Sequence, residues 1–235
     1  MNALCITLLK DRKTFWQSVQ NDNIRWQELL NLLVFIILSC ALYGVILAGT
    51  RSPLLSLYVS IKLPILFLGT ILIVAFFNWM TACMLGSGLS FQKTLIVVLA
   101  AMSISCWVLI GLIPIVLFFQ LSGVPNAGSH DELRYAHNYI LMTHISVLAI
   151  AGVIGNGALL TGLKEVVKPR CSVNALFFLW IVAFAIVGCQ ISWILRPFVG
   201  SPFYPVAFMR ADCLDRNFYE FVFMEVIPFL VAGSK

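Results

Sequence analysis

The chain has 235 residues, of which 61% are hydrophobic and only 11% are charged, and its mean hydropathy is +0.98. An average soluble domain carries roughly 25% charged residues, and a soluble fold of this size could not shield so much apolar surface from water. The composition excludes an ordinary soluble enzyme, a disordered chain and a nucleic-acid-binding module. It predicts an all-α fold, a polytopic bundle of transmembrane helices.

Five apolar runs are each long enough to cross a bilayer, which takes about 20 residues. None of them carries Asp, Glu, Lys or Arg in its interior. Continuous runs of this length favour helices over the alternating strands of a β-barrel. We therefore predict five transmembrane helices, at residues 29–48, 64–85, 95–121, 139–163 and 175–195.

Basic residues between the runs predict the orientation of the chain. The flanks on the side of the N-terminus carry Lys10, Arg12, Lys13, Arg25, Lys93, Lys164, Lys168 and Arg170, whereas the opposite loops carry Arg51, Lys62 and Arg134. The excess of positive charge belongs in the cytoplasm. We predict a bacterial inner-membrane protein with a cytoplasmic segment at 1–27, a transmembrane bundle at 28–196 and an extracytoplasmic tail at 197–235.

Both ends of the chain are expected to form short surface helices. Near the N-terminus, apolar side chains fall on one helical stripe, which suits a helix on the inner membrane surface; its members are Leu4, Leu8, Phe15 and Val19. In the tail, Asn217 and Glu220 are spaced as a capping pair for a helix running to about residue 231. Two carboxylates and Pro228 favour an interfacial helix there, with a sixth span as the alternative.

The fourth apolar run has a stripe of small residues, which lets a neighbouring helix approach closely. The members of this helix-packing stripe are Ala151, Gly155, Ala158 and Gly162. Because the stripe extends to His144 and His137, both histidines should face the bundle. We favour a hydrogen bond between helices for His144. The alternative is a metal or proton site that also uses Asp131 or Glu132, but seven residues separate the two rings by about 10 Å along the helix.

Three amides are expected to be buried in the apolar runs and to bond between helices; they are Asn78, Asn156 and Gln190. The glycine-rich segment 152–157 lies inside a run and has the wrong spacing for a nucleotide loop, so we assign it to helix packing. Pro64 and Pro114 are expected to kink their helices. Lys62 is expected to extend to the outer headgroups.

The densest motif is SWILRPFVGSP at residues 192–202, which ends the fifth run. We predict that it docks the tail against the outer helix ends as an external cap formed by Trp193, Arg196, Pro197, Phe198 and Gly200. Arg196 has five donors in a fixed fork, suited to a carboxylate such as Asp212 or Asp215. The alternative is an ordinary interfacial anchor, with Arg196 on lipid phosphate.

This motif, with FMR at 208–210 and NFYE at 217–220, resembles the C-terminal signature of a set of uncharacterised bacterial multi-pass membrane proteins. That resemblance covers about 30 residues and implies no activity. The five-span plan with a cytoplasmic N-terminus also resembles the Yip1-type membrane family, although the N-terminal segment here is much shorter. The second resemblance implies a non-enzymatic role in membrane organisation or trafficking.

No catalytic, metal or cofactor motif is present in the sequence, and the seven cysteines form no C-x-x-C pair. We therefore expect a non-enzymatic membrane protein without a cofactor, whose partners are the lipid bilayer and either a second copy or another membrane protein. The alternative is a channel or facilitator for a small solute, lined by Asn78, His144, Asn156 and Gln190. An intramembrane enzyme ranks third.

Overall fold

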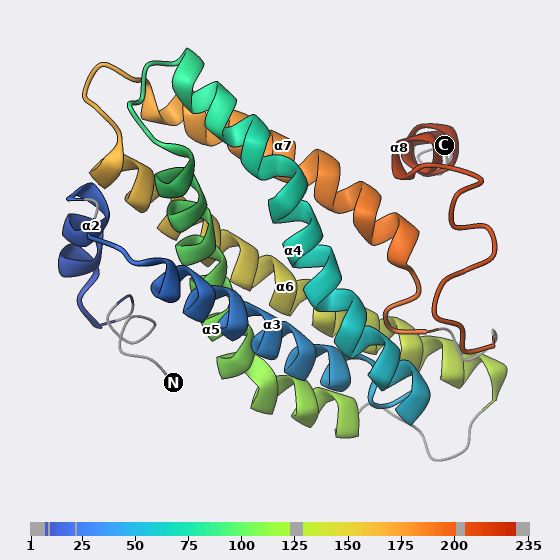
Figure 1. Cartoon of the computed structure of the whole chain (residues 1–235). Helices are drawn as coiled ribbons and strands as arrows, with labels where there is room; N and C mark the ends of the chain where they lie inside the picture. The colour runs from blue at the N-terminus through green and yellow to red at the C-terminus, as the bar shows by residue number, and fades with distance from the viewer. Residues whose placement is uncertain (1–7, 9, 22, 123–128, 201–204, 229–235) are drawn as a thin grey trace.

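The computed structural model describes residues 8, 10–21, 23–122, 129–200 and 205–228, and these residues form an all-α bundle (Figure 1). Five of its helices are long and apolar enough to cross a membrane, as the sequence predicts. The chain is therefore a multi-pass membrane protein by length and composition of its helices. These helices are α3 Trp26–Ala48, α4 Pro53–Met84, α5 Phe91–Ser122, α6 His130–Val166 and α7 Val173–Leu195.

Two of the spans begin well before the apolar runs that identify them. Helix α4 starts at Pro53, where the Ser52 side chain accepts a hydrogen bond from the Leu55 amide, and it continues through Pro64. Helix α6 starts at His130 behind a capping box of Ser129 and Glu132. Polar residues in these first turns lower the hydropathy without stopping the helix, so the predicted starts at 64 and 139 are too late.

The spans form two helix pairs, α5–α6 and α4–α7, and α3 packs on α4 at least as extensively as α7 does (Figure 1). Helix α5 packs along α6, and α4 packs along α7. Helix α3 contacts both α4 and α5 and so joins the pairs on one side of the bundle. Direct contacts between α4 and α5, and between α6 and α7, are much sparser. Two well-packed pairs are thus held together mainly by α3.

A short helix near the N-terminus of the chain, α2 Arg12–Gln20, packs against the C-terminal end of α6. Phe15, Trp16 and Val19 on α2 are buried, and Lys93 Nζ donates to the Gln20 carbonyl over 3.0 Å. The predicted surface helix therefore exists, but its apolar side packs against protein and not against the membrane surface. Leu4 lies outside the described residues.

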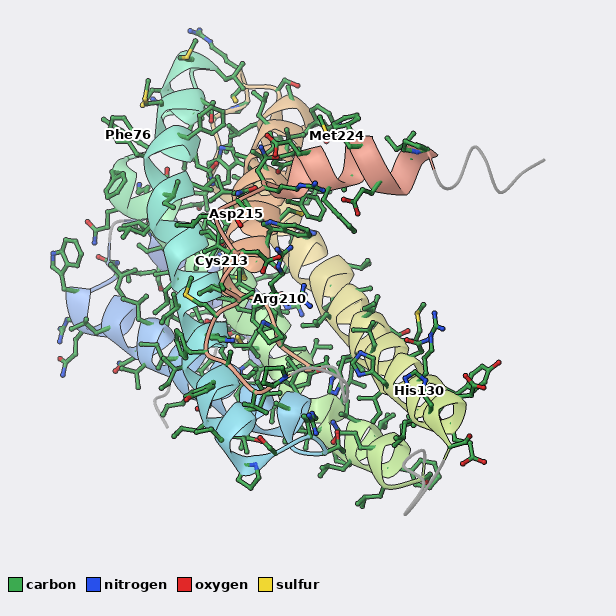
Figure 2. All side chains as sticks on the ribbon, turned by 90° about the vertical axis from the view of Figure 1, so that its right-hand side faces the viewer. Phe76, His130, Arg210, Cys213, Asp215 and Met224 are labelled. Atoms are coloured by element: carbon green, nitrogen blue, oxygen red, sulfur yellow. The ribbon has the colours of Figure 1, made fainter. Side chains whose placement is uncertain are left out.

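The capping box of Asn217 and Glu220 starts the C-terminal helix, as predicted. It consists of α8 Phe218–Phe221 and a π-helical turn, η1 Val222–Val226. Figure 2 shows this helix projecting away from the bundle, with Met224 on its outer part. It is not among the five candidate spans found in the described residues. Its predicted end near residue 231 lies outside the described residues.

The small residues of α6 allow the closest helix contact in the α5–α6 pair. All four residues of the helix-packing stripe are buried: Ala151, Gly155, Ala158 and Gly162. A Cβ at Gly155 would overlap Ser105 Oγ and lie 3.3 Å from the Ala101 carbonyl of α5. At Gly162 the neighbour is the Trp16 ring of α2 and not another span, since a Cβ there would lie 2.6 Å from Trp16 Cζ2.

This contact predicts a large difference between two glycines of α6. Gly155→Leu should destabilise the protein in detergent by about 1–3 kcal/mol, the usual cost of overpacking. Gly157→Leu is the matched control, because a Cβ at Gly157 meets no atom within 4 Å. Thermal unfolding of both variants measures the difference, and equal stability of the two would mean that α5 and α6 do not approach at Gly155.

Candidate functional site

A chain of buried polar side chains connects three helices. His144 of α6 is 1% exposed, and its Nδ1 lies 3.0 Å from the Tyr43 hydroxyl of α3. Its Nε2 lies 3.0 Å from Gln120 Nε2 of α5. The Gln120 amide also donates to the Ile46 carbonyl of α3 over 2.8 Å. His144 therefore bonds between helices on both sides of its ring.

The Ile46 carbonyl determines which groups donate and which accept in this series of hydrogen bonds. A carbonyl accepts only from a donor, so it orients the Gln120 amide with its NH2 group toward both the carbonyl and His144. His144 Nε2 must then accept, which places the imidazole proton on Nδ1 and makes the Tyr43 oxygen its acceptor. Both ring nitrogens are thus occupied by protein groups, and the ring is held neutral.

His137 lies elsewhere on α6 and is half-buried. No group of three or more His, Cys, Asp or Glu side chains could hold a metal ion among the residues with described positions. His144, with both nitrogens used, has none left for a metal. The hydrogen-bonding interpretation of His144 is therefore the one that its geometry favours.

Asn78 of α4 is fully buried, and neither its Oδ1 nor its Nδ2 has a hydrogen-bond partner within the described part of the chain. Its backbone carbonyl, by contrast, accepts from Trp180 Nε1 of α7 over 3.1 Å. The Trp180 indole also donates to Thr81 Oγ1 over 3.2 Å. The prediction that the Asn78 side chain bonds between helices is therefore wrong, and the bond from α7 is accepted by its backbone carbonyl instead.

The other two intramembrane amides do not bond between spans as predicted. Asn156 is exposed on α6, one position beyond the inward-facing Gly155. Gln190 of α7 is half-buried, and its Oε1 accepts from the Phe218 amide over 3.1 Å. Gln190 therefore holds the start of α8, because the tail returns to α7 at that level. The four predicted polar residues lie at separate places and share no common site.

A cavity of about 380 Å³ lies between the two helix pairs. Its wall on α5 and α6 combines small buried residues, Ala101, Ser105, Ala151 and Gly155, with larger apolar side chains, and α4 and α7 contribute mainly apolar side chains and Gly188. Polar groups on its lining belong to Thr70, Ser105 and Asn156. Sequence reasoning found the small-residue stripe but not the cavity, because the stripe does not indicate whether a neighbour fills the space beside it.

At the end of the bundle opposite α2, Lys62 is fully buried under the turn that follows α7. Its Nζ donates to the Pro197 carbonyl over 2.9 Å and lies 5.9 Å and 5.1 Å from the ring centroids of Phe198 and Phe208. The expectation that Lys62 extends to the headgroups is wrong, since the cap covers it. A backbone carbonyl and two aromatic faces take the place of water around the ammonium group.

The rest of the predicted cap also contacts the tail. The Arg196 guanidinium stacks 3.5 Å from the Trp193 ring centroid and pairs with Asp212 over 3.2 Å. Trp193 Nε1 donates to the Arg216 carbonyl over 2.7 Å. Gly200 has a φ of +69°, and a Cβ there would lie 2.5 Å from Leu55 Cδ2 of α4. The tail bearing Arg210, Cys213 and Asp215 crosses the face of the bundle turned to the viewer in Figure 2.

Tyr219 adds a further contact between the tail and α7. Its hydroxyl donates to the Ile186 carbonyl over 2.6 Å. Burial raises the pKa of this phenol above its ordinary value, so it remains a donor throughout the physiological range. The docked position of the tail thus rests on Asp212, Arg216, Phe218 and Tyr219 together.

In comparisons with known proteins, no family model, no curated protein and no solved structure matches the chain. The resemblances seen in the sequence therefore stay predictions.

The two buried amides predict opposite effects of the same substitution. Gln120→Leu should lower the free energy of unfolding by about 1–3 kcal/mol, because it leaves His144 Nε2 without its donor and removes one of the two hydrogen bonds that the Ile46 carbonyl accepts, the other coming from the Gly49 amide. Asn78→Leu should be neutral or stabilising, because it removes a buried amide whose side chain has no partner. Thermal unfolding in detergent measures both; a loss at Asn78 as large as that at Gln120 would contradict the assignment.

Proposed function

We propose that the chain is a non-enzymatic membrane protein that acts by assembling with a second copy of itself through α7. The observation that carries this proposal is the exposed face of α7. In the most apolar 18-residue stretch of α7, 11% of the residues are buried, compared with 61% in that of α5. Ala175, Phe178, Val182 and Ile186 are exposed at steps of three and four, the spacing of a helix-contact seam. The opposite side of α7 is already used by α4.

A channel or facilitator for a small solute is the alternative, and the arrangement of polar groups disfavours it. A polar path needs side chains that share one continuous lining. Asn78 and His144 are closed within helix contacts, Gln190 is covered by α8, and Asn156 stands apart on α6. The walls of the cavity are predominantly apolar.

Cross-linking in native membranes tests the assembly. Phe178→Cys on α7 and Phe76→Cys on α4 are a matched pair, since both side chains are exposed and the Trp180–Asn78 contact places them at similar depth. In a chain without its exposed native cysteines, mild oxidation should give a disulfide-linked dimer with Phe178→Cys and little with Phe76→Cys. Equal yields at the two positions would mean random collision and would overturn assembly through α7.

We further propose that the end bearing α2 faces the cytoplasm of a bacterial cell and that the cap faces outward, as the distribution of Lys and Arg favours. Cys213 is buried, so the exposed Leu214 beside it is the better reporter position. An impermeant thiol reagent on spheroplasts should label Leu214→Cys but not Gln17→Cys of α2. The reverse labelling would invert the orientation.

A further inference from the structure

We propose that the cavity between the two helix pairs is a binding site for the acyl chain of a membrane lipid, which enters between α6 and α7. The site does not depend on self-assembly. It follows from the position, lining, opening and size of the cavity.

The cavity lies near the middle of the bilayer. The residues that line it fall at 66–70 of α4, 98–109 of α5, 148–159 of α6 and 181–188 of α7. Each of these segments lies in the central part of its helix, away from the turns at either end. Hydrocarbon is the surrounding medium at that depth.

The lining offers little to a polar ligand. The Thr70 hydroxyl donates to the Leu66 carbonyl over 2.6 Å, and the Ser105 hydroxyl donates to the Ala101 carbonyl over 3.4 Å. Both hydroxyls are therefore satisfied by their own helices. An apolar cavity of this kind stays dry and takes apolar guests.

The side between α6 and α7 is open. The α5 wall is buried, and α3 packs against α4 and α5 on the other side of the bundle. On the lining, the exposed residues are Asn156 of α6 and Ala185 of α7, so these two helices form the rim. An opening between two spans at this depth faces lipid.

The size selects a slender occupant. The volume of about 380 Å³ falls within the roughly 300–1,000 Å³ of ligand pockets. A spanning helix has about 20 residues and is about 10–12 Å across with its side chains, so it is far bulkier than this cavity. A partner helix would not fit, but a flexible hydrocarbon chain would.

Gly152 offers a way to fill the cavity without disturbing the fold. It lines the cavity, and a Cβ there would meet no atom within 4 Å. The Phe side chain in Gly152→Phe should therefore occupy the space that we assign to the acyl chain. Gly157→Phe is the matched control, since Gly157 is on the same helix, is equally unobstructed and does not line the cavity.

The test uses vesicles of phosphatidylethanolamine and phosphatidylglycerol that contain a phosphatidylcholine with a diazirine near the end of one acyl chain. After illumination, mass spectrometry locates the attached lipid. We expect adducts on the buried α5 wall at Ala101 and Ser105, which lipid around the bundle cannot reach. These adducts should fall several-fold in Gly152→Phe and persist in Gly157→Phe, while adducts at the outward-facing Leu72 remain constant in both.

Three results would overturn the proposal: adducts at Leu72 without adducts on the α5 wall, equal wall labelling in the two variants, or wall labelling by a diazirine fatty acid but not by the phospholipid. If Gly152→Phe fails to fold in detergent, Ala185→Phe at the rim provides the same comparison. Cross-linking through Phe178→Cys is a separate measurement, so failure of α7 assembly and failure of this site are distinguishable.

Discussion

Hydrocarbon offers no hydrogen-bond partner, so backbone polar groups at membrane depth must bond inside the protein, and a polar side chain left without a partner there, as Asn78 is, costs stability. In this bundle many hydroxyls turn back to their own helix, as Ser39 does to the Phe35 carbonyl and Ser103 to the Leu99 carbonyl. Such bonds satisfy the side chain without joining two helices. The chain through His144 is different, because it links α3, α5 and α6 and requires all three to be in register.

Small residues have two opposite consequences on α6. At Gly155 the lack of a side chain is used by α5, which approaches until Ser105 fills the space. At Gly152, three residues earlier and on a neighbouring face, no helix approaches, and the space stays open. Whether a glycine produces a tight contact or a cavity depends on the helix opposite it, and α7 stands too far away to close this one.

Much of the fold could be predicted from the sequence, because apolar length is a property of each segment alone. The five spans and the capping box at Asn217 belong to this class. The hydrogen-bond partners of the site residues do not belong to this class. Tyr43 and His144 are 101 positions apart, and Trp180 and Asn78 are 102 apart, so no local pattern pairs them. Asn156 and Gly155 are adjacent in sequence yet face different surroundings, which only the helix rotation decides.

The burial of Lys62 has a consequence for the order in which the protein is made. Its acceptor, the Pro197 carbonyl, comes 135 residues later in the chain. Since synthesis runs from the N-terminus, α4 enters the bilayer while the group that will shield its ammonium does not yet exist. The nascent chain must keep this cation at the headgroups until α7 is complete and the turn closes over it. A turn that is synthesised much later therefore completes the burial of a side chain on a helix that was inserted earlier.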